Sequence, residues 1–329
     1  MIPHSKPCVG TDEERAVARV LQSGMLAQGA EVAAFEDECA AFLGHQHAIA
    51  VSSGTAGLHL SLLALGLQGK WVAYSSYACA ALTQAVCMAG AKAVLCDCDE
   101  DGNLDWSEVE DDVDGVIAAH LFGKVGPLEE RGIPVIEDIA QSYGAPCGTK
   151  TLLSVTSFYA TKLMTTGEGG MIFCDDAGLA EYLRDLRDYD NRDDFQPRFA
   201  YKLTEMQAAM GREQLKKFPD FLQRRKAIAT KYTAAFKDLP LRLPPSDPDH
   251  LYFRYVVGTD AWSALADSLA RDGVSASRPV HHPAHFDLGG DYPMATRLHE
   301  ESLSLPLYPA LSDSDVDAVI QSVLRFFGA

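Results

Sequence analysis

Short apolar runs alternate with stretches of helical periodicity from about residue 45 to residue 215, and this pattern constrains the fold of the chain more than any other feature. Helical periodicity is found, for example, over residues 56–65 and 77–88. Strands are expected at 48–52, 71–74, 93–96, 115–119, 134–137, 155–158 and 170–174. Such alternation is typical of an α/β protein with a mainly parallel sheet covered on both faces. Ligands bind such sheets at the carboxyl ends of the strands, so we expect the chemistry in the loops that follow them.

The length of 329 residues exceeds the roughly 250–300 at which a single core stops growing, so we expect two lobes. Thr204–Gln207 has the pattern of a capping box, which predicts a helix through residue 217. Pro219 is expected to interrupt this helix. Further elements are expected at 221–236 (helix), 252–257 (strand), 262–271 (helix) and 314–326 (helix). We therefore predict a large lobe over 1–215 and a smaller C-terminal lobe over 216–329.

Charge and hydropathy exclude several classes of function. The chain has 28 Lys and Arg against 46 Asp and Glu, a net charge of −18 that repels nucleic acid. No stretch approaches the roughly 18–20 apolar residues of a membrane span. The first residues have no apolar core or cleavage site typical of a signal peptide. With eight sparse cysteines, these features indicate a cytoplasmic protein with reduced thiols.

Two clusters in the sequence contain possible metal ligands, namely Cys96-Asp97-Cys98 and the histidines at 281, 282 and 285. Neighbouring strand residues point to opposite faces, and neither cluster has a second ligand pair at zinc spacing. We expect no metal site.

Three segments at expected strand ends have the residue types of a binding or catalytic site. The first, Val51–Leu60, passes from a strand through Ser-Ser-Gly-Thr into a helix. Free amides at a helix N-terminus, with a glycine and hydroxyl groups beside them, can bind an anion. Alternatively, Ser53 or Thr55 simply caps the helix.

The second segment, Ile133–Gly144, brings Glu137 and Asp138 to the end of an apolar strand, with Gln141 three residues later. A carboxylate held there must be paired or hydrogen-bonded to stay charged. It could hold a protonated ring nitrogen of a cofactor, or it could cap the next turn.

The third segment contains Lys162 between a strand ending near Ser157 and a glycine-rich loop around Gly167. Desolvation lowers the pKa of a lysine, and a partly neutral amine is what Schiff-base chemistry requires. An exposed loop lysine is the ordinary alternative.

In this order, the motifs SSGTAGLHL, EDIAQSYGA and SFYATK with GEGGMI resemble those of the DegT/DnrJ/EryC1/StrS sugar aminotransferases. These are pyridoxal-phosphate (PLP) enzymes of fold type I, the aspartate aminotransferase-like fold. The resemblance extends through HLFGKVGPLE, YKLTEMQAAMGREQLKKF, RPVH and LSLPLYPALSDSD, and so covers nearly the whole chain. It implies a three-layer α/β/α large domain with a seven-stranded sheet, and a small α+β domain.

The resemblance also implies residue roles. Lys162 would form the Schiff base with PLP and carry protons, while Asp138 would pair with the pyridinium nitrogen. Gln141 would contact the cofactor near its phenolic oxygen. Gly54, Thr55 and Ser157 would hold the phosphate. Two further residues complete the expected cofactor-binding set, namely Ala56 and Cys79.

Two positions depart from the family pattern. Cys79 stands where an aromatic ring commonly covers the cofactor, and Tyr77 could replace that ring only in another backbone register. Ala200 stands where the family usually has an asparagine that reaches the phosphate from the neighbouring subunit. Both changes predict looser cofactor binding, unless Arg198 or Lys202 compensates.

The resulting expectation is an aminotransferase that passes an amino group from glutamate or glutamine to a keto sugar, which we expect to be nucleotide-linked. Alternatives are a cyclitol aminotransferase, a sugar dehydratase, or a non-catalytic relative that binds or regulates. The intact Lys162 disfavours the dehydratase, whose family members have histidine there. The resemblance further implies a homodimer with shared active sites, residues of 187–203 serving the neighbouring subunit.

Overall fold

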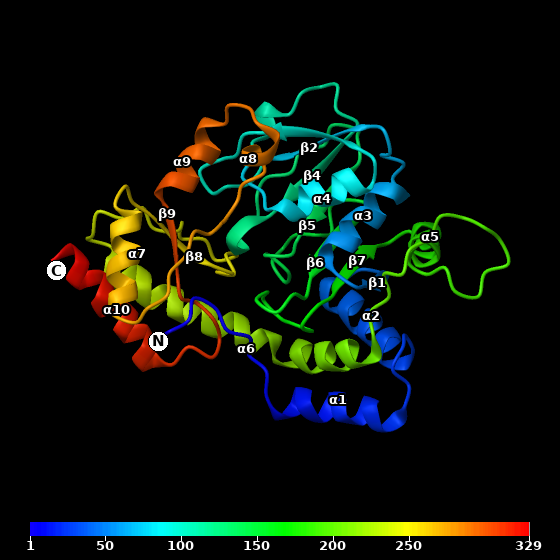
Figure 1. Cartoon of the computed structure of the whole chain (residues 1–329), viewed down its shortest axis with the longest axis horizontal. Helices are drawn as coiled ribbons and strands as arrows, with labels where there is room; N and C mark the ends of the chain where they lie inside the picture. Colours follow the sequence, from blue (N-terminus) through cyan, green and yellow to red (C-terminus); the bar gives the residue numbers. More distant parts are fainter. Residues whose placement is uncertain (329) are drawn as a thin grey trace.

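The computed structural model describes residues 1–328 and has a seven-stranded sheet at the centre of its larger lobe (Figure 1). All seven expected strands are present: β1 (His47–Val51), β2 (Trp71–Ser75), β3 (Lys92–Cys96), β4 (Gly115–Ala119), β5 (Val135–Asp138), β6 (Leu153–Ser157) and β7 (Gly170–Cys174). Their order is β1-β7-β6-β5-β4-β2-β3. Only β7 runs antiparallel to its neighbours, β1 and β6. The mainly parallel sheet predicted for a fold type I enzyme is therefore confirmed.

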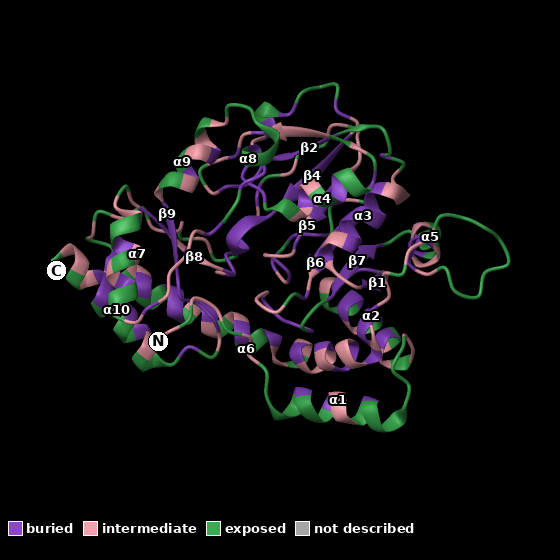
Figure 2. Cartoon of the chain, in the orientation of Figure 1, coloured by how far each residue is buried: buried purple, intermediate pink, exposed green. Residues whose placement is uncertain are grey.

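Helices cover both faces of this sheet, which explains why its strands are nearly continuous apolar runs. On β1, Ile49 and Val51 pack in a core with α3 (Gly54–Ala64), α4 (Ala80–Met88) and α5 (Ala177–Arg187). Ala48 and Ala50, on the opposite face, pack in a second core with α2 (Ala30–Leu43) and α6 (Glu205–Phe236). Figure 2 shows the sheet buried between these layers. The carboxyl ends of the parallel strands thus open toward the second lobe.

Helix α6 corrects the prediction of two helices separated at Pro219. It runs unbroken for 32 residues with Pro219 inside it. Pro219 is exposed, so water can hydrate the carbonyl that the missing amide leaves unpaired. The first half packs against α1 (Thr11–Ser23) and α2, and the second half contributes Ile228, Tyr232 and Phe236 to the core of the smaller lobe. Packing on both sides outweighs the cost of the proline.

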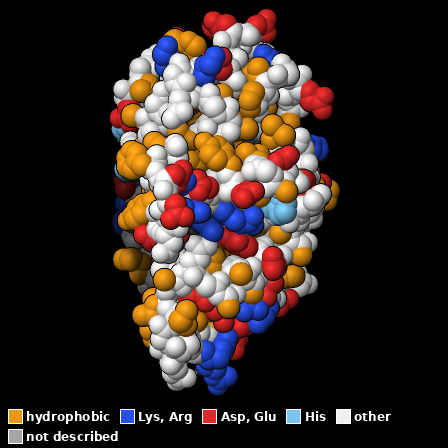
Figure 3. Space-filling model, turned by 90° about the vertical axis from the view of Figure 1, so that its right-hand side faces the viewer, with side chains coloured by type: hydrophobic (Ala, Val, Ile, Leu, Met, Phe, Trp, Pro, Cys, Tyr) orange, Lys and Arg blue, Asp and Glu red, His pale blue; other side chains and the backbone are white. Residues whose placement is uncertain are grey.

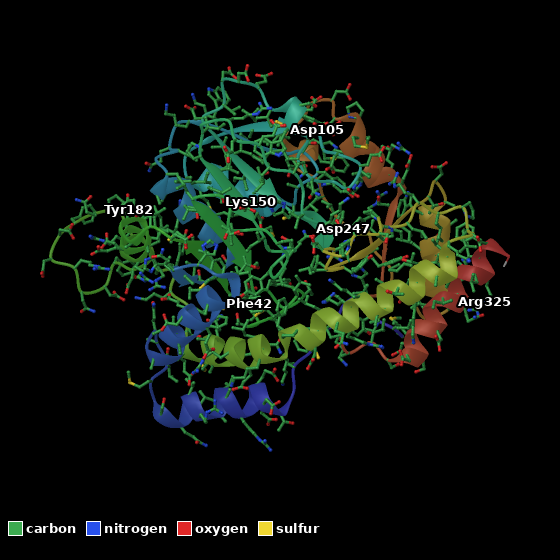
Figure 4. The ribbon with its side chains drawn as sticks, turned by 180° about the vertical axis from the view of Figure 1, so that it is seen from behind. Phe42, Asp105, Lys150, Tyr182, Asp247 and Arg325 are labelled. Atoms are coloured by element: carbon green, nitrogen blue, oxygen red, sulfur yellow. The ribbon has the colours of Figure 1, made fainter. Side chains whose placement is uncertain are left out.

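The smaller lobe pairs β8 (Tyr255–Gly258) antiparallel with β9 (Ser302–Leu305), a strand that was not predicted. Strand β8 begins three residues later than expected, because Tyr252 has a φ of 51° that ends the extended conformation. The helices α7 (Trp262–Arg271) and α10 (Asp313–Phe327) pack in the core of the smaller lobe. The short α8 (His285–Leu288) and α9 (Pro293–Glu301) lie further along the chain than α7, but Ala295 and Leu298 of α9 pack in the core of the larger lobe. Seen from behind, Tyr182 of α5 and Arg325 of α10 mark opposite ends of the molecule (Figure 4).

We propose the lobe boundary within α6, near residue 216. Ile228, Tyr232 and Phe236 of α6 pack with β8, β9, α7 and α10 in a separate core, which supports this division. The first residues of the chain also pack there, since Ile2 pairs with Val274. Within residues 1–328, no helix is both long and apolar enough to cross a bilayer.

Candidate active site

A cavity of about 270 Å³ opens at the carboxyl ends of the parallel strands. The N-termini of α3 and α4, the end of β5 and the loop after β6 all contribute to it. It is the place where residues from all three sequence segments meet. The expected site residues that line it are Gly54, Thr55, Cys79, Asp138, Gln141, Ser157 and Lys162.

The first turn of α3 faces this cavity because it is packed tightly against β6. A Cβ on Gly54 would lie 2.9 Å from the Cβ of Ser157, so only glycine allows this approach. Ser53 caps the helix by accepting a hydrogen bond from the Ala56 amide at 3.0 Å. The cap therefore exists, but it uses the Ala56 amide and leaves Gly54 and Thr55 at the cavity. Ala56 is buried and is not among the lining residues.

Asp138 is the last residue of β5, and its side chain enters the cavity from there. Oδ1 accepts a hydrogen bond from the Ala140 amide at 2.9 Å. Burial raises the pKa of Asp138, whereas the nearby positive charge of Lys162 and the Ala140 hydrogen bond oppose the rise. Asp138 is thus a desolvated carboxyl group whose ionised form depends on a cation in the same cavity.

Lys162 follows β6 in a turn closed by a hydrogen bond from its amide to the Tyr159 carbonyl. Burial lowers the pKa of the Lys162 amine, and Arg254 lowers it further, whereas Cys79 and Asp138 act in the opposite direction. Its Nζ lies 5.4 Å from the ring centroid of Phe253. No carboxylate lies within 4.0 Å of Nζ among the described residues. This desolvated amine is free to react, unlike an exposed loop lysine.

Gln141 is oriented by its own amide oxygen, which accepts a hydrogen bond from the Phe122 amide at 2.8 Å. Its Nε2 remains available toward the cavity. Phe122 has a φ of 59°, an uncommon backbone conformation for a residue with a side chain. The strained turn and Gln141 therefore hold each other in place.

His120 lines the cavity as well, although it was not among the site residues predicted from the sequence. Its Nδ1 accepts from the Gly126 amide at 3.1 Å, so Nε2 donates to Glu137 at 3.1 Å. Glu137 also accepts from the Gly148 amide and from Thr151. These partners lower the pKa of Glu137 against the effect of burial. The other acid at the end of β5 is thus part of the buried support beneath the site.

One group of possible metal ligands was not foreseen, namely His120, Glu137 and Cys147. The His120 and Glu137 atoms are used in the hydrogen bonds just described, and Cys147 Sγ lies 3.4 Å from Ser142 Oγ. Of the predicted clusters, Cys96 and Cys98 are buried free thiols. His282 bonds to Asp287, and His285 to the Ser76 carbonyl. Hydrogen bonds within the protein account for His120, Glu137, Cys147, His282 and His285.

Cys79 lies at the N-terminus of α4, with its thiol exposed to the cavity. Tyr77 lies on the other side of the backbone, is fully buried, and lines a separate cavity. The backbone therefore does not adopt the register that would bring the Tyr77 ring into the site. Of these two residues, only Cys79 lines the cavity that holds Lys162 and Asp138.

The loop after α5 carries Ala200, which is exposed. Figure 3 looks onto this end of the molecule, where basic and acidic side chains are interspersed. Arg198 pairs with Asp185 and Asp194 at 2.8 and 2.9 Å, and Lys202 pairs with Asp188 at 2.6 Å. Both cations that were expected to compensate for Ala200 are therefore already paired within their own segment.

A mainly parallel α/β sheet with a half-buried lysine and a carboxylate in one cavity at the strand ends is typical of fold type I PLP enzymes. The model of the DegT/DnrJ/EryC1/StrS aminotransferase family matches residues 7–324. The chain belongs to this family and is an aminotransferase.

Similar proteins span the whole chain. The spore coat polysaccharide biosynthesis protein SpsC of Bacillus subtilis is 33% identical, over 98% of this chain and 96% of its own. The aminotransferase TlmJ of Streptoalloteichus hindustanus is 31% identical, with a TM-score of 0.92 over 100% of both chains. DesV of S. venezuelae is 30% identical, with a TM-score of 0.90 over 96% of this chain and 94% of its own.

The family is PLP-dependent, and the residues of the cavity fit this cofactor. The tight approach of Gly54 to Ser157 leaves a helix N-terminus facing the cavity, suited to a phosphate. Lys162 is a desolvated amine without a carboxylate partner, and Asp138 is a desolvated carboxyl group that needs a cation. A phosphate, an aldehyde and a protonated ring nitrogen would satisfy these three features.

Proposed function

We propose that this protein transfers an amino group from glutamate or glutamine to a nucleotide-linked keto sugar, using PLP. Family membership supports the sugar as the acceptor class, and SpsC is by name a polysaccharide biosynthesis protein. The observation that carries the proposal is the presence of Lys162 and Asp138 in one cavity beside the N-terminus of α3.

PLP, when bound, supplies an aldehyde that takes up and releases the amine and a ring that delocalises negative charge. Gly54, Thr55 and Ser157 would hold the phosphate, and Gln141 would offer its Nε2 to an oxygen of the cofactor. Asp138 would hold the protonated ring nitrogen. Lys162 would hold the aldehyde group through Nζ, and its free amine would carry a proton at the same atom. Its lowered pKa leaves a larger neutral fraction for both tasks.

We also propose that two copies associate, with residues of 187–203 from each reaching the site of the other. The loop over 188–200 extends away from its own lobe beyond α5 (Figure 1), and this supports the proposal. Light scattering of the active enzyme tests it. A dimer is expected, and an active monomer would contradict the shared site.

The reaction is tested in two half-reactions. Holoenzyme mixed with glutamate or glutamine should lose its visible absorbance and release the corresponding keto acid. Adding a panel of nucleotide-linked keto sugars should restore the absorbance and produce an aminated sugar, with a cyclitol ketone as comparison. If only the cyclitol ketone restores the absorbance, the acceptor is a cyclitol and not a nucleotide-linked sugar. If neither glutamate nor glutamine removes the absorbance, neither is the amino donor.

A further inference from the structure

A second cavity, of about 200 Å³, lies between the lobes and adjoins the first. Leu121 lines both, and Tyr77 of the second cavity directly precedes Ala78 and Cys79 of the first. The loop from the smaller lobe that carries Asp247 lies between the sheet and the C-terminal helices in Figure 4, and His250 of this loop reaches the cavity. Neither the expected site residues nor the proposed chemistry uses this space.

The second cavity has polar groups that the protein leaves without partners. Tyr77 Oη and His250 Nδ1 are both buried, and among the described residues neither has a hydrogen-bond partner. Asp101 is paired with Lys124, and Arg242 lies 3.5 Å from Glu301. Glu100 is exposed at the rim. Arg254 is the lining cation that remains to be accounted for.

The guanidinium of Arg254 has no carboxylate within 4.0 Å among the described residues. Its side chain bonds only to His4, with Nη1 3.1 Å from Nε2. Burial and the Arg254 charge lower the pKa of His4 to about 4, so this partner is neutral. A half-buried guanidinium with a neutral partner is costly unless an anion joins it.

A comparison with Arg225 shows that this arrangement is not simply structural. Arg225 also lacks a carboxylate, but its Nη1 donates to the carbonyls of Phe253 and Leu307 at 3.2 Å each. These carbonyls bind its charge within the protein. Arg254 has no such carbonyl partners, and it lines a cavity.

Arg254 lies close to the reacting amine. Its Cζ is 5.2 Å from the ring centroid of Phe253, and Lys162 Nζ is 5.4 Å from the same point. The Arg254 charge is also one cause of the lowered pKa of Lys162. An anion bound at Arg254 would therefore lie near the Phe253 ring that Lys162 also contacts, in the vicinity of the amine that we propose exchanges the amino group.

We propose that Arg254, with Tyr77 Oη in the same cavity, binds the carboxylate of the amino donor. In an amino acid, amine and carboxylate share one carbon, so a carboxylate anchor must lie near the amine-exchanging group. A volume of about 200 Å³ suits a group of amino-acid size, because pockets for larger ligands occupy roughly 300–1,000 Å³. A planar guanidinium matches a carboxylate in two parallel hydrogen bonds.

This inference rests on the proposed donor half-reaction, and Arg254→Gln tests it. The second-order rate constant of the half-reaction with glutamate should fall about 30-fold or more. Truncating one member of a desolvated charge pair usually weakens binding by at least this factor. A simple alkylamine has no carboxylate, so its rate should be unchanged. Arg254→Lys should restore part of the glutamate rate. Arg297→Gln, which removes an exposed arginine paired with Glu301, is the control and should behave as wild type.

A binding measurement tests the carboxylate anchor independently of amine transfer. Glutarate has carboxylates but no amine, so its binding to the holoenzyme reports the anchor whether or not an amine is transferred. Arg254→Gln should abolish this binding while PLP affinity stays unchanged. Equal glutarate affinity in the variant and in wild type would overturn the assignment. A rise in KM for the nucleotide sugar alone would instead indicate a diphosphate site. Equal losses with glutamate and alkylamine would indicate a merely structural role.

Discussion

Lys162 and Asp138 line one cavity, and each opposes the effect of burial on the pKa of the other. Burial favours the neutral form of both groups, whereas their mutual attraction favours the charged forms. Burial and mutual attraction therefore act in opposite directions on the pKa of each group. This relationship leads to a prediction about stability.

Lys162→Met should make the cofactor-free protein more stable at neutral pH. Because the pKa of Lys162 is lower in the folded state than its ordinary 10.5, the unfolded chain binds more protons between these two values. Stability therefore rises with pH across this window, and the cost of the buried charge is fully present below it. Thermal unfolding of both proteins over this pH range should give a Tm gain that shrinks toward pH 10.5. A variant that is less stable at neutral pH would contradict the desolvated amine.

Gly54→Ala should weaken PLP binding, because the new Cβ would lie 2.9 Å from the Cβ of Ser157 and force α3 away from β6. Overpacking of this kind costs about 1–3 kcal/mol, which corresponds to roughly a 5- to 150-fold weaker Kd. Titration with PLP measures it. Gly178→Ala, in the first turn of α5, is the matched control and should retain wild-type affinity. Equal affinity of Gly54→Ala and wild type would place the phosphate elsewhere.

Cys79→Tyr should tighten PLP binding by placing a ring where the thiol now faces the cavity. Stacked aromatic pairs contribute about 0.5–1.5 kcal/mol, so the Kd should fall roughly 2- to 12-fold. Cys87→Tyr introduces the same ring at an exposed cysteine of the same helix and should leave the Kd unchanged. A weaker Kd in Cys79→Tyr alone would show that Cys79 does not occupy the stacking position.

The seven strands of the sheet could be predicted because each is a short apolar run followed by a turn or helix signal, such as Gly115–Ala119 with all five residues buried. Local patterns failed where packing between distant segments decides the structure. Pro219 predicted a break that the packing of α6 overrides. The conformation of Tyr252 depends on its contacts with the larger lobe, since the neighbouring Leu251 amide bonds to the Gly123 carbonyl.

The same distinction holds for the site. Lys162, Asp138 and the first turn of α3 follow strands and could be located from the sequence. Arg254 could not, because neither its nearness to Lys162 nor its lack of an acidic partner is visible until the lobes are packed together. The bonding of His120 to Glu137 likewise joins two strand ends that only the sheet brings together.

We propose that Nζ of Lys162 is the atom that binds PLP. Absorbance during titration of the cofactor-free protein with PLP tests it most directly, with Lys162→Ala compared against Lys150→Ala, an exposed lysine outside the cavity. We expect a visible band in wild type and in Lys150→Ala, and no such band in Lys162→Ala. A band of wild-type strength in Lys162→Ala would contradict it.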